Sequence, residues 1–116
     1  MVDFTDFMPT LADIAGIPAP QNFGILDGKS FNPVLLDSVS SSRTYVFNHF
    51  QPLISPEHTR AIRYVQNSTY KLYETGEFYN IAKDIEETSP IPSDQLTTQE
   101  VQTEDLFTLV LSQMHN

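Results

Sequence analysis

The sequence contains neither cysteine nor tryptophan, and basic residues are scarce. Without cysteine, the 116-residue chain has no disulfide, no thiolate metal site and no cysteine nucleophile. Six Lys and Arg against fifteen Asp and Glu give a net charge of -9. This acidity disfavours nucleic acid and anionic lipid as partners, because both require clusters of basic residues. We therefore expect the chain to bind neither nucleic acid nor membrane.

Long apolar stretches are missing as well. No run of the sequence approaches the roughly 20 apolar residues that span a membrane. Residues 1–6 also lack the basic region and the apolar core of a signal peptide. These absences leave the compartment open. Eight Phe and five Tyr in a chain of this length predict one folded domain with a packed core.

The spacing of apolar residues predicts helices at both ends of an α+β chain. Three-and-four spacing indicates a first helix over 5–15, with Thr5 or Asp6 as its cap. A short helix over 31–36 is expected after a loop rich in Pro and Gly. Near the C-terminus, Thr97 and Glu100 form a capping box that begins a last helix.

Between these helices, alternating residues predict a four-stranded antiparallel sheet with the C-terminal helix packed on one face. Asn67-Ser68 and Thr75-Gly76 supply turns, because Asn and Gly tolerate positive φ. The acidic stretch 82–96 is expected to be a surface loop. We divide the chain into an N-terminal helical segment with its loop, 1–42, and a small sheet subdomain, 43–116. The expected strands cover 43–50, 59–66, 69–74 and 77–81.

Four carboxylates near the N-terminus could be interpreted as a metal cluster. Three of them have a simpler structural explanation, since Asp6 caps a helix, Asp13 lies on a polar helix face and Asp27 forms a turn. We therefore expect no metal site among these residues, which also include Asp3.

Charged and aromatic residues of the central meander form a second group of candidates. Lys71 could bind an anion, but a pair with Glu77 or a neighbouring carboxylate is the simpler interpretation. Arg60 or Arg63 is expected to pin the acidic loop to the sheet through residues such as Asp84 or Glu86. Tyrosines at alternating strand positions could form a sugar platform, but cross-strand packing explains them better. They are Tyr64, Tyr70, Tyr73 and Tyr79.

Several motifs follow one another in a specific order. Residues 2–17 contain the pattern D-x-x-PT-L-x-x-x-AG, and residues 26–31 contain a DG-K-S turn. Residues 61–63, 70–73 and 77–87 then follow the pattern R…YK-L…E-[FL]-Y-x-[IL]-x-x-D-x-x-E. In this order and spacing, the motifs resemble the C-terminal portion of the sulfatase family, the arylsulfatase type of alkaline-phosphatase-like hydrolases. Asn80 and Ile85 depart from the Asp and Pro that are usual in this family.

The resemblance implies a parent enzyme that hydrolyses sulfuric esters. In this family, a formylglycine made from Cys or Ser in a C/S-x-P-x-R motif acts together with a calcium or magnesium ion. This sequence contains no such motif, and the family's metal ligands lie upstream of the matching portion. The resemblance therefore implies no catalytic residue, no metal ligand and no cofactor in this chain, which we expect to be inactive alone.

The sulfatase C-terminal subdomain lies beside the mouth of the active site. By this analogy, residues of the predicted strand 43–50 and of the loop after it are candidates for a substrate rim: Asn48, His49 and His58. The resemblance also implies that the first helix belongs with the missing catalytic domain. Uncovered, its apolar face predicts self-association or domain swapping of the isolated chain, or folding of this segment onto the small sheet. The face consists of Phe4, Phe7, Met8, Leu11 and Ile14.

Two other interpretations stay open at the level of sequence. The chain could be a stand-alone binding or interaction module that keeps this subdomain without its catalysis. It could also be a fragment of a related phosphoester hydrolase, because the superfamily shares this architecture.

Overall fold

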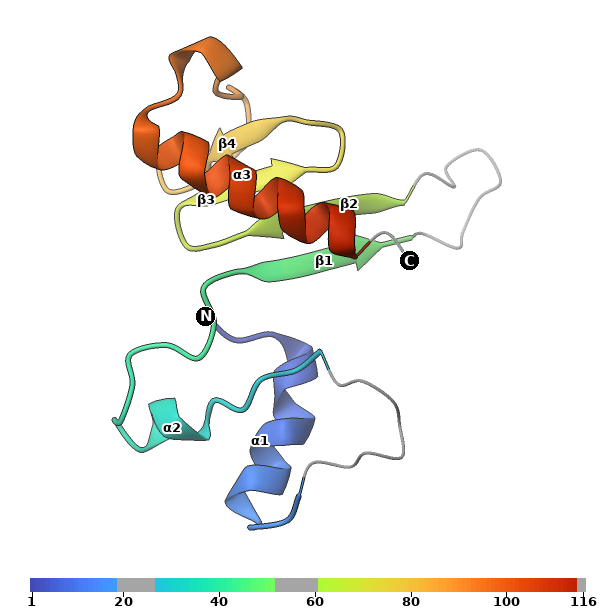
Figure 1. The fold of residues 1–116 in the computed structure, drawn as a ribbon, viewed down its shortest axis with the longest axis vertical. Coiled ribbons are helices and arrows are strands. Elements are labelled where there is room, and N and C mark those ends of the chain that lie inside the picture. Colours follow the sequence, from blue (N-terminus) through green and yellow to red (C-terminus); the bar gives the residue numbers. More distant parts are fainter. Residues whose placement is uncertain (19–26, 52–60, 115–116) are drawn as a thin grey trace. The chain divides into compact units, whose positions relative to one another are not determined.

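The computed structural model describes residues 1–18, 27–51 and 61–114 and has the predicted α+β fold (Figure 1). The chain divides into two compact units, Met1–Val46 and Phe47–Asn116. The first contains the N-terminal helical elements, and the second contains most of the sheet and the C-terminal helix.

The predicted first helix consists of a 3-10 turn, η1 (Phe4–Asp6), followed by the α-helix α1 (Phe7–Ile14). Asp3 caps η1, because its side chain accepts the N–H of Thr5 while the Asp6 side chain accepts the N–H of Asp3. The prediction that Thr5 or Asp6 caps this helix was therefore wrong. Gly16, at a φ of +66°, follows α1 where the chain leaves the helix.

The short second helix, α2 (Asn32–Leu35), packs against α1 within the first unit (Figure 1). Pro33 lies in its first turn, where a missing N–H costs nothing. The turn before α2 approaches η1 so closely that a Cβ at Gly28 would lie 2.0 Å from the carbonyl oxygen of Thr5. Only glycine fits at this position without a shift of the backbone.

The second unit is organised by an antiparallel sheet of strand order β1-β2-β3-β4. Val65 of β2 lies opposite Leu72 of β3, which in turn lies opposite Phe78 of β4. This register places the three apolar side chains on one face of the sheet. The strands are β1 (Val46–Phe50), β2 (Ile62–Gln66), β3 (Tyr70–Tyr73) and β4 (Phe78–Asn80).

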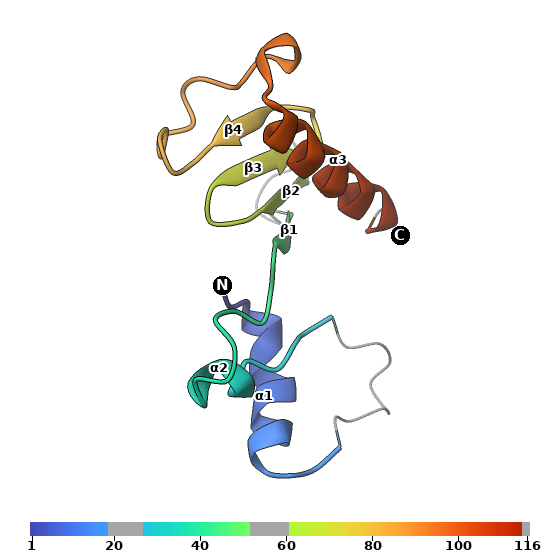
Figure 2. The ribbon, with the colours of Figure 1, turned by 60° about the vertical axis from the view of Figure 1, so that its left-hand side comes forward.

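The C-terminal helix α3 (Thr98–Gln113) lies across one face of β2 and β3 (Figures 1 and 2). The predicted capping box of Thr97 and Glu100 begins it. Phe107 and Val110 of α3 are buried with the apolar strand residues. The second unit therefore has a conventional core between a helix and a sheet.

The two hairpin turns reach their shape in different ways. Gly76 has the expected positive φ, at +99°. Asn67 does not, because its Oδ1 instead accepts the backbone N–H groups of Thr69 and Tyr70 at 2.8 and 2.7 Å. Hydrogen bonds to the Asn67 side chain thus shape this turn without the positive φ that we expected.

Candidate functional site

Helix α1 and the turn before it bury polar side chains. Asp6 is 0% exposed, and Thr10 is 2% exposed. The Asp6 carboxylate accepts hydrogen bonds from Arg43 Nε at 2.7 and 2.8 Å and from Arg43 Nη2 at 2.5 Å. It also accepts the backbone N–H of Lys29 at 2.7 Å. Asp6 therefore joins α1 to two segments that lie more than twenty residues away in sequence.

The pKa of Asp6 reflects these contacts. Burial by itself would raise the pKa of this carboxyl group above its ordinary value of 3.8. Hydrogen bonds from Arg43, and from the backbone N–H groups of Lys29 and Asp3, outweigh burial and hold the pKa at about 2. The carboxylate is therefore charged near neutral pH and serves as an anchor for the first unit.

Two further hydrogen-bonded side chains continue this polar side of α1. Thr10 Oγ1 donates to the carbonyl oxygen of Asp6 at 2.6 Å and accepts the N–H of Phe31 at 3.0 Å. Asp13 accepts the hydroxyl of Ser30 at 2.7 Å. The rotation of α1 about its own axis is thus fixed by polar contacts along its length.

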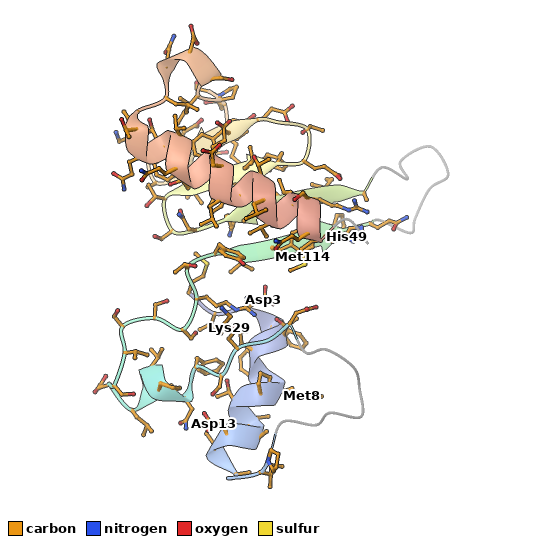
Figure 3. All side chains as sticks on the ribbon, in the orientation of Figure 1. Asp3, Met8, Asp13, Lys29, His49 and Met114 are labelled. Carbon is orange, nitrogen blue, oxygen red and sulfur yellow. The ribbon has the colours of Figure 1, made fainter. Side chains whose placement is uncertain are left out.

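The opposite side of α1 presents apolar side chains to the outside. In Figure 3, Met8 and Asp13 point from different sides of the helix. Phe7 is partly covered, because its ring meets Phe31 edge-on with centroids 5.4 Å apart. We call this exposed surface the α1 apolar face; its members are Phe4 (88% exposed), Phe7 (49%), Met8 (49%), Leu11 (65%) and Ile14 (57%).

A second cluster lies on the face of the sheet that points away from Leu72 and the core. The Lys71 ammonium lies over the rings of Tyr64 and Tyr73, at 4.1 and 4.6 Å from their centroids. It donates to Glu87 Oε1 at 2.7 Å, while the Tyr73 hydroxyl donates to Glu87 Oε2 at 2.5 Å. One carboxylate from the acidic loop therefore binds two side chains of β3, and we call this arrangement the Glu87 clasp.

The pKa values in the clasp follow from the mutual contacts. Burial alone would raise the pKa of Glu87, but the hydrogen bond from Lys71 outweighs burial and lowers it. Burial would likewise lower the pKa of Lys71, yet the bond to Glu87 raises it. Burial and the Glu87 carboxylate together raise the pKa of Tyr73. All three groups thus keep their ordinary charge at neutral pH, which suits a structural contact better than proton transfer.

The clasp holds the acidic loop through a contact that the sequence interpretation did not include, since Lys71 binds Glu87. We expected Arg60 or Arg63 to hold this loop through residues such as Asp84 or Glu86. Arg63 pairs with Glu74 at 3.0 Å, and Arg60 lies outside the described residues, so its part of the expectation stays a prediction. For Lys71 we predicted a pair with Glu77 or a neighbouring carboxylate. The partner is a carboxylate, but it is that of Glu87 and not that of Glu77.

The tyrosines divide between the two faces of the sheet. Tyr70 stacks on Phe78 on the core side, with centroids 5.3 Å apart, and its hydroxyl donates to Glu100 at 3.2 Å. Tyr64 and Tyr73 contact each other on the opposite face, and Tyr79 meets Tyr73 edge-on at 6.0 Å. Cross-strand packing therefore accounts for these rings, as the alternation predicted.

The residues predicted for a substrate rim are only partly described. Asn48 is half-buried and His49 is exposed, both on β1; Figure 3 labels His49. His58 lies outside the described residues. Their role at a rim stays a prediction.

An open cleft of about 310 Å³ lies in the second unit, with residues of α3 and of the β3–β4 hairpin in its lining. Its lining includes Leu72 and Leu111 together with Glu74 and Glu104. Among the lining residues that the structure describes, there is no Lys, Arg or His that would attract a sulfate group. The cleft is therefore a poor place for a sulfated ligand.

No group of three or more His, Cys, Asp or Glu side chains that could hold a metal ion occurs among the described residues. Within that same part of the chain, no helix is both long and apolar enough to cross a bilayer.

A model of the family described as "N-sulphoglucosamine sulphohydrolase, C-terminal" matches residues 1–114. The chain belongs to this family. A sulfatase of Formosa agariphila is 35% identical over 97 residues, which cover 72% of this chain and 17% of the relative. The family match and this relative confirm the resemblance to the C-terminal portion of sulfatases.

A solved structure supports the fold of this sulfatase C-terminal domain. BT4656, in complex with its substrate D-glucosamine-2-N,6-O-disulfate, matches with a TM-score of 0.66 and 20% identity. The match covers 93% of this chain and 22% of that chain. The chain thus spans about a fifth of the length of each of these two relatives.

Sequence reasoning did not identify Arg43 or Glu87. Arg43 lies 37 residues from its partner Asp6, at the start of the predicted strand 43–50 and just after a polar connector. Glu87 is one of several acidic residues in its loop, but a positive φ of 53° distinguishes it. Glu87 is the last residue of the motif over 77–87, but the motif does not show which side chains it contacts, so only the fold reveals the two pairs.

Proposed function

We propose that this chain is the non-catalytic C-terminal domain of an enzyme that hydrolyses sulfuric esters, and that it has no hydrolase activity alone. The observation that carries the proposal is the family match over residues 1–114, in a chain that spans only 17% of its sulfatase relative. The nucleophile and metal ion of such an enzyme belong to the remaining four-fifths of a protein of that length.

The sequence supports the second half of this proposal. It contains no C/S-x-P-x-R motif from which a formylglycine could be made. The charged residues that the structure describes in clusters, Asp6 with Arg43 and Lys71 with Glu87, are paired with each other. These pairs stabilise the domain, and the rest of the enzyme supplies the formylglycine and the calcium or magnesium ion.

A substrate rim is the contribution that this domain would make to catalysis. Asn48 and His49 on β1, with His58 beyond it, are the side chains that we assign to this role. The substrate named for BT4656, a disulfated glucosamine, makes sulfated amino sugars the class to test first.

An assay of the isolated chain tests the proposal. We expect no release of sulfate from an aryl sulfate or from glucosamine 6-sulfate above the rate in buffer. Turnover above that rate, retained after repeated purification, would sink the proposal.

A chimera gives the complementary test. The segment of the Formosa agariphila sulfatase that aligns with this chain is either deleted or replaced by residues 1–114. Deletion should abolish the activity of the relative, and replacement should restore a measurable part of it. If the isolated chain binds sulfated glucosamine and the chimera stays inactive, the results would instead favour a stand-alone binding module. Activity of the chimera on phosphate esters only would favour a phosphoester hydrolase.

A further inference from the structure

The acidic loop covers one edge of the sheet. Strand β4 is the last in the order β1-β2-β3-β4, so one of its sides lies at the edge of the sheet that the structure describes (Figure 1). A bare strand edge presents N–H and C=O groups with which a strand of another chain can pair. Here the residues that follow β4 turn back and bind to this edge.

The backbone carbonyls of Phe78 and Asn80 point to the edge. Across the ladder with β3, the carbonyl oxygen of Glu77 accepts the N–H of Tyr73 at 3.0 Å. Because successive residues of a strand alternate in direction, Phe78 and Asn80 direct their backbone groups away from β3. The Phe78 oxygen accepts the N–H of Ile91 at 2.7 Å, and the Asn80 oxygen accepts two N–H groups of the turn after β4. The loop itself therefore binds both outward carbonyls.

Two prolines flank the residue that binds to this edge. Ile91 lies between Pro90 and Pro92, and proline has no backbone N–H to donate to a further strand. The N–H of Ile91 is already bonded to Phe78. Residues 90–92 therefore end the sheet and do not offer a new edge to another chain.

The Glu87 clasp holds this loop against the sheet. The Glu87 carboxylate binds Lys71 and Tyr73 of β3 at 2.7 and 2.5 Å, four residues before Ile91. Glu87 also has a φ of +53°, a conformation that is unfavourable for a residue with a side chain. The contacts of the clasp offset this strain. Without them, the backbone at Glu87 is more stable in another conformation, which would move Ile91 away from β4.

The turn that carries Glu87 is compact. The Asp84 carboxylate accepts the N–H groups of Thr88 at 3.1 Å and of Ser89 at 2.8 Å. Residues 84–89 are thus linked to one another as well as to β3. We expect the whole turn to leave the sheet together when the clasp opens.

We propose that residues 82–92 form a strap, which the Glu87 clasp keeps closed over the outer edge of β4, and that the closed strap prevents β4 from pairing with β4 of a second copy. Strand β4 itself has no other protection of this kind. It contains two aromatic residues, Phe78 and Tyr79, and no charged residue. Such a strand pairs readily when its edge is bare, whereas a charge on the strand would oppose pairing.

Three substitutions in the intact chain test the proposal. Glu87→Gln removes the charge of the clasp, and Glu86→Gln makes the same change at the exposed neighbouring residue as a control. Tyr73→Phe removes only the hydroxyl that binds Glu87 and is the milder test variant. All three keep the α1 apolar face, so a difference between them does not come from that face. Amide hydrogen exchange measures the opening of the strap at Ile91, and sedimentation velocity measures association.

We expect the Ile91 amide to exchange faster in Glu87→Gln than in Glu86→Gln by roughly tenfold or more, with Tyr73→Phe between them. The core amide of Val65 should exchange equally slowly in all three. If Val65 shows that Glu87→Gln unfolds, the comparison of Tyr73→Phe with Glu86→Gln decides. Equal exchange of Ile91 in the test variants and the control would overturn the role of the clasp.

Association tests the role of the strap. With rising concentration, the variants with an open strap should associate more than the control, and their Phe78 and Asn80 amides should gain protection. An open strap without additional association would overturn the proposal. So would association that protects the amides of α1 and leaves those of Phe78 and Asn80 unchanged. The proposed function does not depend on either outcome.

Discussion

The two units of this molecule are stabilised in opposite ways. In the second unit, apolar side chains from three strands and a helix fill a common core: Val65, Leu72, Phe78, Phe107 and Val110. In the described part of the first unit, the buried apolar side chains are only Ala12 and Val46, and hydrogen bonds around Asp6 connect its segments instead.

The difference shows which unit is built to stand alone. Burial of apolar surface is the dominant favourable term in folding. A buried ion pair, in contrast, recovers little more than the cost of desolvating its charges. We therefore expect the second unit to be stable by itself and the first unit to depend on a partner that covers the α1 apolar face.

The largest expected effect is in the core of the second unit. Phe107→Ala should lower the free energy of unfolding by about 3–5 kcal/mol, because it opens a cavity under the helix. The matched change Phe4→Ala removes a phenyl ring from a position that is 88% exposed. It should change the free energy of unfolding by about 0.5 kcal/mol or less. Urea denaturation followed by circular dichroism measures both. Similar losses for the two variants would contradict the contrast between the units.

The anchor of the first unit gives the next effect. Asp6→Asn keeps the shape of the side chain but leaves the Arg43 guanidinium without its charged partner, and should cost the first unit about 2–4 kcal/mol. Glu74→Gln, at the more exposed pair with Arg63, should cost about 1 kcal/mol or less. The amide resonances of Thr10 and Phe31 report on the first unit in an NMR spectrum. They should lose their dispersion in the first variant and keep it in the second.

Some of these features could be predicted from sequence and others could not. Local patterns located the meander and the capping box of Thr97 and Glu100, because their determinants lie within a few residues. The Asp6–Arg43 pair could not be predicted, since its two members are 37 residues apart. The apolar residues of the α1 face were recognised from their spacing, but the polar contacts that turn them outward are long-range and invisible in that pattern.

Acid should weaken the two units to different degrees. The pKa of Asp6 is about 2 in the folded chain against an ordinary 3.8, so its contribution is present above about pH 4 and is lost as the pH falls toward 2. The shift corresponds to a contribution on the order of 2 kcal/mol. NMR titration of the Lys29 amide should show this transition, and Asp6→Asn should remove it. If the transition survives in this variant, a group other than Asp6 causes it.

The last predicted effect is a local one, at the Glu87 clasp. Glu87→Gln removes the charge that binds Lys71 and Tyr73 and should cost about 1–3 kcal/mol, confined to the acidic loop and β3. Because the pKa of Glu87 is lowered from its ordinary 4.5, the clasp should also weaken as the pH falls below that value. The Tyr73 ring resonances would report the change. Unaltered Tyr73 resonances in the variant would show that the clasp contributes nothing.

Amide hydrogen exchange of the isolated chain tests the contrast between the units most directly. Amides of β2 and β3, such as those of Val65 and Leu72, should exchange only through global unfolding of their unit. Amides of α1, such as those of Leu11 and Ile14, should exchange orders of magnitude faster, because few apolar side chains are buried in the described part of the first unit. Protection of α1 in the isolated chain equal to that of β2 and β3 would contradict the claim that the first unit needs a partner.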